Sequence, residues 1–410
     1  MGEIKKISGG ICAPKGFKAG GIACGIKASS KKRDLALIYS EKPCAAAAVF
    51  TTNRVKAASV LVSREHVAGG VLRAVIVNSG NANACTGEAG LAAARKMASL
   101  AAGRLNIDSR QVAVASTGVI GVPLPIDVIE KNIGALADSL RADEAGHAAA
   151  LEAIMTTDIR KKEGAVEIEI EGKSVRIGGM VKGSGMIHPN MATMLCFITT
   201  DAAIPPEVLD SCLRQAVGRS LNRITVDSDT STNDSCFIMA NGEAGNSPIA
   251  AGSASCEIFT GALEALCVDL ARATARDGEG ATKLVTVTVF GAVNEDAAAT
   301  LARAVASSSL VKAACFGADA NWGRVLCAMG YSGAGFNPGE VDVVFASAGE
   351  EIQVCAAGAS LPFSEENAKK ILKREEIEIR IKAGKGPGKA QSWGCDLTYD
   401  YVKINGDYRS

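Results

Sequence analysis

The 410-residue chain is poor in aromatic residues and histidine, and its charges cancel. Phe, Trp and Tyr make up only 4% of it, so we expect Ala, Val, Ile and Leu in tightly layered elements to fill the core. The three histidines, His66, His147 and His188, are too few for a multi-histidine metal centre. The 44 basic and 44 acidic residues leave no electrostatic footprint for nucleic acid.

The sequence also lacks paired cysteines and long apolar runs. Its 13 cysteines are scattered singly and never form a CxxC pair, which is typical of reduced, buried thiols rather than a disulfide framework or a zinc site. No run approaches the roughly 18 apolar residues that span a bilayer, and the opening MGEIKKISGG has no apolar stretch to act as a signal. We therefore expect a soluble, cytoplasmic protein without a metal site.

Strand-like and helix-like segments alternate along most of the chain. We predict strands at 73–78, 112–115, 195–200, 283–290, 341–346, 352–356 and 377–381. We predict helices at 85–105, 126–140, 205–220, 259–275 and 296–314. Period-two alternation over 166–177, around Glu171 and Gly172, indicates a hairpin. The fold class is α/β or α+β, with large sheets layered with helices, and the strand order stays open.

A loop rich in glycine and small polar residues, KGSGMIHPNMATML at 182–195, leads into the apolar run that we predict as a strand. The Thr193 hydroxyl therefore lies where a flexible loop meets rigid structure. His188 in this loop is a candidate base or ligand, but a lone histidine before a proline is more often a loop-ordering hydrogen-bond partner.

Two glycine-rich turns after predicted strands are further candidates. In STGVIG at 116–121, the Thr117 hydroxyl and the Gly118 N–H could serve as oxyanion-hole donors, although an ordinary turn has the same composition. The stretch NSGNANACTGEAG at 78–90 fits neither GxGxxG nor GxxxxGK[ST], so it favours a turn packed near another site over a nucleotide cradle. Residues 276–280 and 405–410 are, by default, an exposed loop and tail.

Six motifs nevertheless occur together and in order along the chain: GNANACTG, STGVIG, KGSGMIHPNMATML, RDGEGATK, DANWGR and NGDYRS. Together they resemble the ornithine acetyltransferase family of arginine biosynthesis, also called glutamate N-acetyltransferase. The resemblance runs from FTTNRV near Phe50 to the last residue. It implies a DmpA-like and ornithine-acetyltransferase-like architecture of the N-terminal-nucleophile type.

The resemblance implies that the precursor cleaves itself between Ala192 and Thr193. The alpha chain, 1–192, and the beta chain, 193–410, would then pack around one shared active site, in a heterotetramer with two copies of each. Thr193, at the new amino end, would be the nucleophile. Its α-amino group, with a pKa of about 7.7 to 8.0, can accept the hydroxyl proton near neutral pH. A charged Lys182 nearby would lower that pKa further.

The family's site residues carry over one by one. The resemblance assigns the oxyanion hole to Thr117 and Gly118. It assigns substrate binding to Thr156, Lys182, Thr193, Glu279, Asn405 and Ser410. Ser410 stands where the family has Thr, and Gly406 where Ala is usual; both changes keep a hydroxyl and a small neighbour.

The implied activity is transfer of acetyl from N-acetylornithine to glutamate, by a ping-pong mechanism through acetyl-Thr193. No cofactor is expected, and acetyl-coenzyme A stays open as a second acetyl donor. Two alternatives remain. An N-terminal-nucleophile amidase or aminopeptidase would pass the acyl group to water, and a ligand-binding protein would use the glycine turns as an anion cradle.

Overall fold

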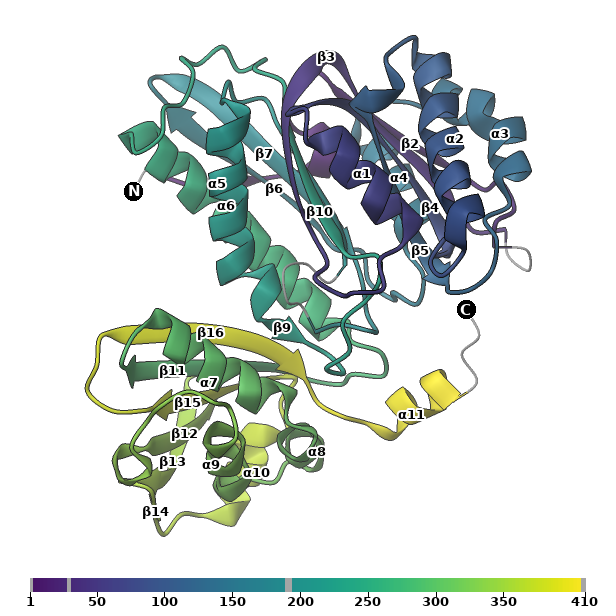
Figure 1. Ribbon diagram of the computed structural model, residues 1–410. Helices are drawn as coiled ribbons and strands as arrows, with labels where there is room; N and C mark the ends of the chain where they lie inside the picture. The colour runs from purple at the N-terminus through teal and green to yellow at the C-terminus, as the bar shows by residue number, and fades with distance from the viewer. Residues whose placement is uncertain (1–2, 28–30, 189–193, 407–410) are drawn as a thin grey trace.

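The computed structural model describes residues 3–27, 31–188 and 194–406. These residues form two bodies, each built on one sheet (Figure 1). Within the described ranges the larger sheet has nine strands, in the order β1-β6-β7-β8-β10-β3-β4-β5, with β2 also paired to β3. Its strands are β1 (Lys5–Ile7), β2 (Phe17–Ile22), β3 (Leu35–Phe50), β4 (Val71–Asn81), β5 (Val112–Val119), β6 (Glu163–Ile170), β7 (Lys173–Lys182), β8 (Leu195–Thr200) and β10 (Ser235–Ala240).

The long strand β3 joins the two halves of this sheet. Its first half pairs with β2 and β4 and its second half pairs with β10, while its register with β4 shifts between Tyr39 and Cys44. The strand curves over at the top of Figure 1, so the carboxyl ends of β5 and β7 and the first residues of β8 and β10 approach the same edge. Lys182 and Ser235 both pair with Leu195 there. Segments before residue 189 and after residue 193 therefore share one sheet.

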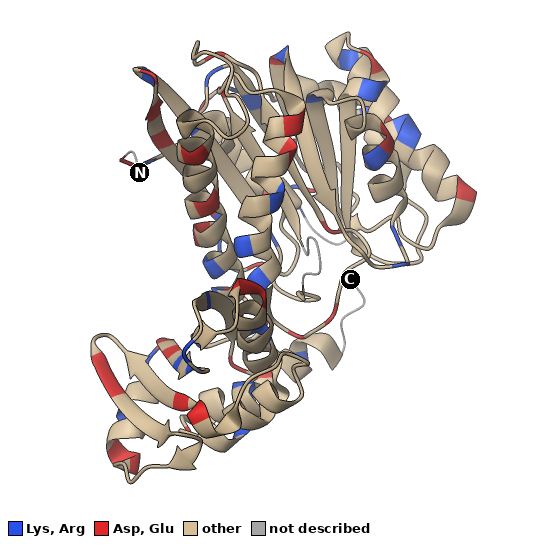
Figure 2. Ribbon diagram, turned by 60° about the vertical axis from the view of Figure 1, so that its left-hand side comes forward, with Lys and Arg blue, Asp and Glu red and all other residues tan. Residues whose placement is uncertain are grey.

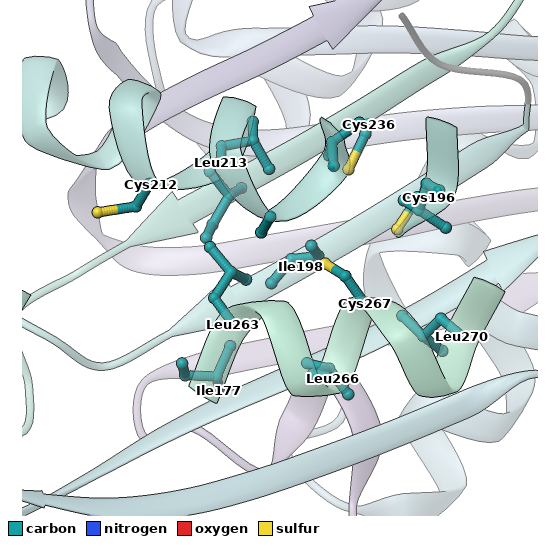
Figure 3. Packing of buried hydrophobic residues seen from close by; sticks show 14 of the residues in the cluster. Ile177, Cys196, Ile198, Cys212, Leu213, Cys236, Leu263, Leu266, Cys267 and Leu270 are labelled. Carbon is teal, nitrogen blue, oxygen red and sulfur yellow. The ribbon is translucent and has the colours of Figure 1, made fainter. Parts of the chain in front are cut away.

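Helices cover both halves of the larger sheet, because their apolar faces pack on alternate strand residues. In Figure 3, Leu213 of α5 and Leu263 of α6 pack with Ile177 and Ile198 of the sheet. The outer face of β3, β4 and β5 is covered in the same way by α1, α2 and α3, while α4 packs on the inner face. These helices are α1 (Ala58–Val67), α2 (Gly87–Leu105), α3 (Ile126–Asp138), α4 (Glu144–Ile154), α5 (Pro206–Arg219) and α6 (Ala254–Arg276).

The second body is built on a sheet with the order β14-β13-β12-β15-β11-β16-β9, seven strands among the described residues. Its strands are β9 (Ile224–Thr225), β11 (Leu284–Ala292), β12 (Asp342–Ser347), β13 (Glu350–Ala356), β14 (Ala359–Ser360), β15 (Glu376–Lys382) and β16 (Gly388–Cys395). Its helices are α7 (Glu295–Ser307), α8 (Ser309–Gly317), α9 (Trp322–Gly330) and α10 (Glu365–Leu372). The last helix, α11 (Tyr399–Gly406), extends away from this body toward the lower edge of the first (Figure 1). Short 3-10 turns lie at Gly10–Cys12, Ser109–Gln111, Leu221–Arg223 and Pro338–Glu340.

The predicted α/β class with layered sheets and helices is confirmed, and each predicted strand is present. Four local expectations were wrong. Residues 276–280, expected to be an exposed loop, are buried or half-buried, and Arg276 is the last residue of α6. β5 runs on to Val119, so Thr117 and Gly118 end a strand instead of forming a free turn. The predicted helix 296–314 is two helices, because Ser308 separates them and accepts a hydrogen bond from Val311 N as the cap of α8. The tail expected at 405–410 begins within α11.

The distribution of charged residues and cysteines in the structure agrees with most of what the composition predicts. Lys and Arg alternate with Asp and Glu over both bodies in Figure 2. All 13 cysteines are free thiols, but they are not all buried as expected, since Cys85 and Cys327 are exposed. No helix within the described ranges is long and apolar enough to cross a membrane.

Candidate active site

One pocket lies where the ends of β5 and β7 meet the starts of β8 and β10. The predicted site residues that the structure describes all line it: Thr117, Gly118, Thr156, Lys182, Glu279 and Asn405. Met194 and Leu195 also line the wall, immediately after Thr193 in sequence. Ala192, Thr193 and Ser410 lie outside the described residues, and so does the rest of NMAT at 190–193.

The end of β5 supplies Thr117 and Gly118 to this pocket. β5 and β4 approach so closely that a Cβ on Gly118 would lie 2.3 Å from the carbonyl carbon of Gly80. Gly118 also has a φ of 132°, a conformation that only glycine adopts readily. The strand end is therefore a site where glycine is required and where the backbone is held next to the pocket.

Lys182, the last residue of β7, is buried and donates a 3.1 Å hydrogen bond from Nζ to Thr117 Oγ1. Burial lowers the pKa of Lys182, and the charge of Lys162 lowers that pKa too, whereas Asp158 acts in the opposite direction. The ammonium group fills one acceptor position of the Thr117 hydroxyl, so the hydroxyl proton stays available to a ligand in the pocket.

Glu279 enters the pocket from the loop after α6. It is buried, and its Oε2 accepts a 2.9 Å hydrogen bond from Asn405 Nδ2 of α11. The Glu279 N–H donates to Ser184 O over 2.9 Å. Gly185 makes room for the carboxylate, since a Cβ on Gly185 would lie 2.2 Å from Glu279 Oε2. A cation and an anion thus face one pocket from different elements.

The segment that leads toward residue 189 is anchored on the other side by Asp227, whose carboxylate accepts hydrogen bonds from Met186 N at 2.6 Å and Ile187 N at 2.8 Å. His188 Nδ1 lies 3.0 Å from Thr225 Oγ1, and burial lowers its pKa. Among the described contacts His188 orders the loop, which agrees with the favoured expectation for it.

The other glycine-rich motif packs beside the pocket, as expected. Asn81 Oδ1 accepts from Asn83 N at 2.8 Å, and Asn78 Nδ2 donates to Asn81 O at 2.8 Å. Ala82 of this turn lines the pocket. The motif DANWGR lies in the second body instead, where Asn321 caps α9 by accepting from Arg324 N.

Two buried residues that shape the pocket were missed by the motif analysis. Asn233 donates from Nδ2 to Ala82 O at 2.6 Å and to Ser116 O at 2.7 Å, so it ties the two strand ends together. Asp158 accepts from Thr156 N at 2.9 Å and Gly183 N at 2.7 Å. The polar run DSDTSTND, directly before the buried strand β10, was the available signal for Asn233. For Asp158 the sequence offered no signal beyond its place in TTD at 156–158.

Comparison with known proteins identifies close relatives. The ArgJ family model matches residues 18–410. The arginine biosynthesis bifunctional protein ArgJ of Symbiobacterium thermophilum is 53% identical over 405 residues, 98% of this chain and 99% of that protein. The protein of the same name from Gloeobacter violaceus is 49% identical over 411 residues, 100% of both chains.

Solved structures are similar over about half of this chain. The ArgJ protein of Bacillus halodurans is 44% identical with a TM-score of 0.49, covering 52% of this chain and 98% of that one. The ornithine acetyltransferase of Mycobacterium tuberculosis, solved with ornithine, is 42% identical with a TM-score of 0.44, covering 46% of this chain and 100% of that one. From the family match and the full-length relatives, this chain belongs to the ArgJ family of arginine-biosynthesis enzymes.

Proposed function

We propose that this protein transfers the acetyl group of N-acetylornithine to glutamate through an acetyl ester on Thr193. The observation that carries the proposal is that Thr117, Gly118, Lys182 and Glu279 line one pocket, whose wall also includes Met194 and Leu195. A nucleophile one residue before that wall would reach a substrate held by these groups. The full-length relatives named as bifunctional arginine-biosynthesis proteins support the same activity.

In the first half-reaction, Thr193 Oγ attacks the acetyl carbonyl carbon, and its proton moves to the α-amino group of Thr193. The carbonyl oxygen becomes an oxyanion that the Thr117 hydroxyl and the Gly118 N–H stabilise. The contact from Lys182 Nζ to Thr117 Oγ1 favours this role, because it leaves the hydroxyl proton free to donate. The carbon–nitrogen bond then breaks, the proton passes to the leaving nitrogen, and ornithine departs.

In the second half-reaction, the α-amino group of glutamate attacks the acetyl ester. The carbon–oxygen bond breaks, Thr193 Oγ regains a proton from the attacking nitrogen, and N-acetylglutamate leaves. Donor and acceptor share an α-carboxylate but differ in side-chain charge, ammonium against carboxylate. Lys182 and Glu279 supply both signs of charge to the pocket, so one site can receive both substrates.

The proposal includes self-cleavage between Ala192 and Thr193, which frees the amino group that acts as base. The products, 1–192 and 193–410, would stay together because β7 and β8 pair side by side, with Lys182 opposite Leu195. We further propose a cytoplasmic heterotetramer with two copies of each chain. The reaction needs no cofactor beyond its substrates, and acetyl-coenzyme A would be the second acetyl donor of a bifunctional enzyme.

Mass spectrometry of the purified protein, with a transfer assay, tests this proposal. We expect two chains in place of one of 42.0 kDa, and N-acetylglutamate formed from N-acetylornithine and glutamate. Thr193→Ala should stay intact and inactive. Acetate in place of N-acetylglutamate would favour the amidase alternative, and an intact, inactive wild-type chain would overturn the enzyme proposal.

A further inference from the structure

Three buried charged side chains lie behind the pocket and connect its two charged walls. Lys162 Nζ lies 2.7 Å from Asp158 Oδ1 and also bonds to Asp277 Oδ2. All three residues are buried, and none of them lines the pocket itself. They are called the buried triad below.

The first arm of the buried triad holds the wall that carries Thr156 and Lys182. Asp158 Oδ2 accepts from Thr156 N at 2.9 Å, and its Oδ1 accepts from Gly183 N at 2.7 Å. One carboxylate therefore fixes the backbone at Thr156 and directly after Lys182. Both are pocket residues on segments about 25 residues apart in sequence.

The second arm holds the wall that carries Glu279. Asp277 ends α6 two residues before Glu279, and its Oδ2 accepts from Ile159 N and Arg160 N, each at 3.3 Å. Asp277 Oδ1 is buried without a hydrogen bond among the described residues. The loop of Glu279 is thus bonded to the same turn, 158–162, that supports the opposite wall.

A buried ion pair of this kind is a weak source of stability, because desolvation of the charges offsets their attraction. The fixed geometry of the ion pair therefore matters more here than its contribution to the free energy of unfolding. We propose that the buried triad is a positioning unit of the acetyl-transfer site, which sets the separation of the Thr156 and Lys182 wall from the Glu279 wall. This inference rests on the proposed function, because it concerns how that site holds its substrates.

The proposal predicts a loss of substrate positioning in the variants that still fold. In Asp158→Asn the amide can accept only one of the two backbone N–H groups and loses the attraction for Lys162. A displacement of about 1 Å in such a site can cost up to a hundredfold in rate. The melting temperature should fall, because a buried N–H group is left without an acceptor. In the protein that folds, we expect the KM for N-acetylornithine to rise about tenfold or more and kcat to fall.

Two further variants guard against misfolding. Asp158→Asn/Lys162→Met/Asp277→Asn removes all three charges together, so no unpaired charge remains within the buried triad itself. Asp277→Asn leaves Asp158 and Lys162 paired and releases only the Glu279 wall. Each should raise KM in the self-cleaved protein. The variants that fold test the proposal.

Asp201→Asn is the matched control. Asp201 is also a buried carboxylate that accepts two backbone N–H bonds, from Lys15 at 3.1 Å and Arg176 at 2.8 Å. It follows the far end of the six-residue strand β8, roughly 20 Å from the pocket edge at 3.3 Å per residue. We expect its KM and kcat to stay within about twofold of the wild type.

The kinetic constants of the purified, self-cleaved proteins distinguish a role in substrate positioning from a purely structural role. If the buried triad only stabilised the fold, its substitution would lower the melting temperature and the active fraction and leave KM unchanged. Folded triad variants with wild-type KM and kcat, or with the values of Asp201→Asn, would overturn the inference while the wild type still transfers acetyl. A wild type without transfer would instead remove the proposed function.

Discussion

Asn405 of α11 donates a 2.9 Å hydrogen bond to Glu279 of the loop after α6, so the last helix closes onto the pocket. Two further contacts secure this arrangement. Thr398 Oγ1 donates to Gly280 O at 2.7 Å, and a Cβ on Gly280 would lie 2.6 Å from Tyr401 N. The loop that carries Glu279 and the start of α11 therefore fit together at a position where glycine is required.

Removal of the Asn405 contact should let water compete for the acetyl ester. In Asn405→Ala the closed edge of the pocket loses its hydrogen bond to a charged group, an interaction of about 1.5 to 3 kcal/mol. We expect acetate release to rise about tenfold relative to N-acetylglutamate formation, measured with N-acetylornithine and glutamate together. Lys403→Ala, on an exposed residue of the same helix, is the control. An unchanged ratio in Asn405→Ala would refute the closing role of α11.

Loss of the Thr117 hydroxyl should slow chemistry more than binding. Thr117→Ala removes one proposed oxyanion donor, and such a loss costs roughly a hundred- to a thousandfold in kcat. The matched variant Thr117→Ser keeps the hydroxyl and should retain most of the rate. Single-turnover release of ornithine measures the step directly. A Thr117→Ala protein within about threefold of the wild type would place the oxyanion elsewhere.

The sequence predicted segments whose pattern is local and missed those set by long-range packing. β8 is a continuous apolar run, and the β6–β7 hairpin alternates around Glu171 and Gly172, so both were predicted. β3 was missed because its Ala-rich second half has a single β-branched residue, Val49, and it becomes a strand only between β4 and β10. The described site residues were identified through motif resemblance. Asp158 and Asn233 were not, because their roles depend on backbone groups far away in sequence.

Gly185 should be required to make space for the Glu279 carboxylate. A Cβ at this position would lie 2.2 Å from Glu279 Oε2, and the backbone has no positive φ, so the effect of Gly185→Ala is a local steric clash. We expect kcat/KM to fall at least about tenfold because the carboxylate is displaced. Gly103→Ala, which meets no atom within 4 Å, is the control and should leave kinetics unchanged. Equal kinetics in the two variants would show that Glu279 can move without consequence.

The pH dependence of transfer should report the protonation of Lys182. Burial, the largest influence, lowers the pKa of Lys182, and Lys162 lowers it further, while Asp158, Asp234 and Glu279 oppose the shift. Lys182 therefore loses its proton at a lower pH than an ordinary lysine, whose pKa is about 10.4.

The charged ammonium group has no lone pair and can only donate to Thr117 Oγ1, whereas the neutral amine can also accept the Thr117 hydroxyl proton. We therefore expect kcat/KM to fall as pH rises through this lowered pKa. Asp158→Asn removes a charge that raises the pKa, and the alkaline limb should move to still lower pH. Lys182→Arg keeps its charge across this range, so its limb should move upward even where its rate is lower. Profiles of kcat/KM from about pH 6 to pH 11 for the three proteins provide the measurement. A wild-type limb at the ordinary lysine pKa, unmoved in Asp158→Asn, would exclude Lys182 as the titrating group.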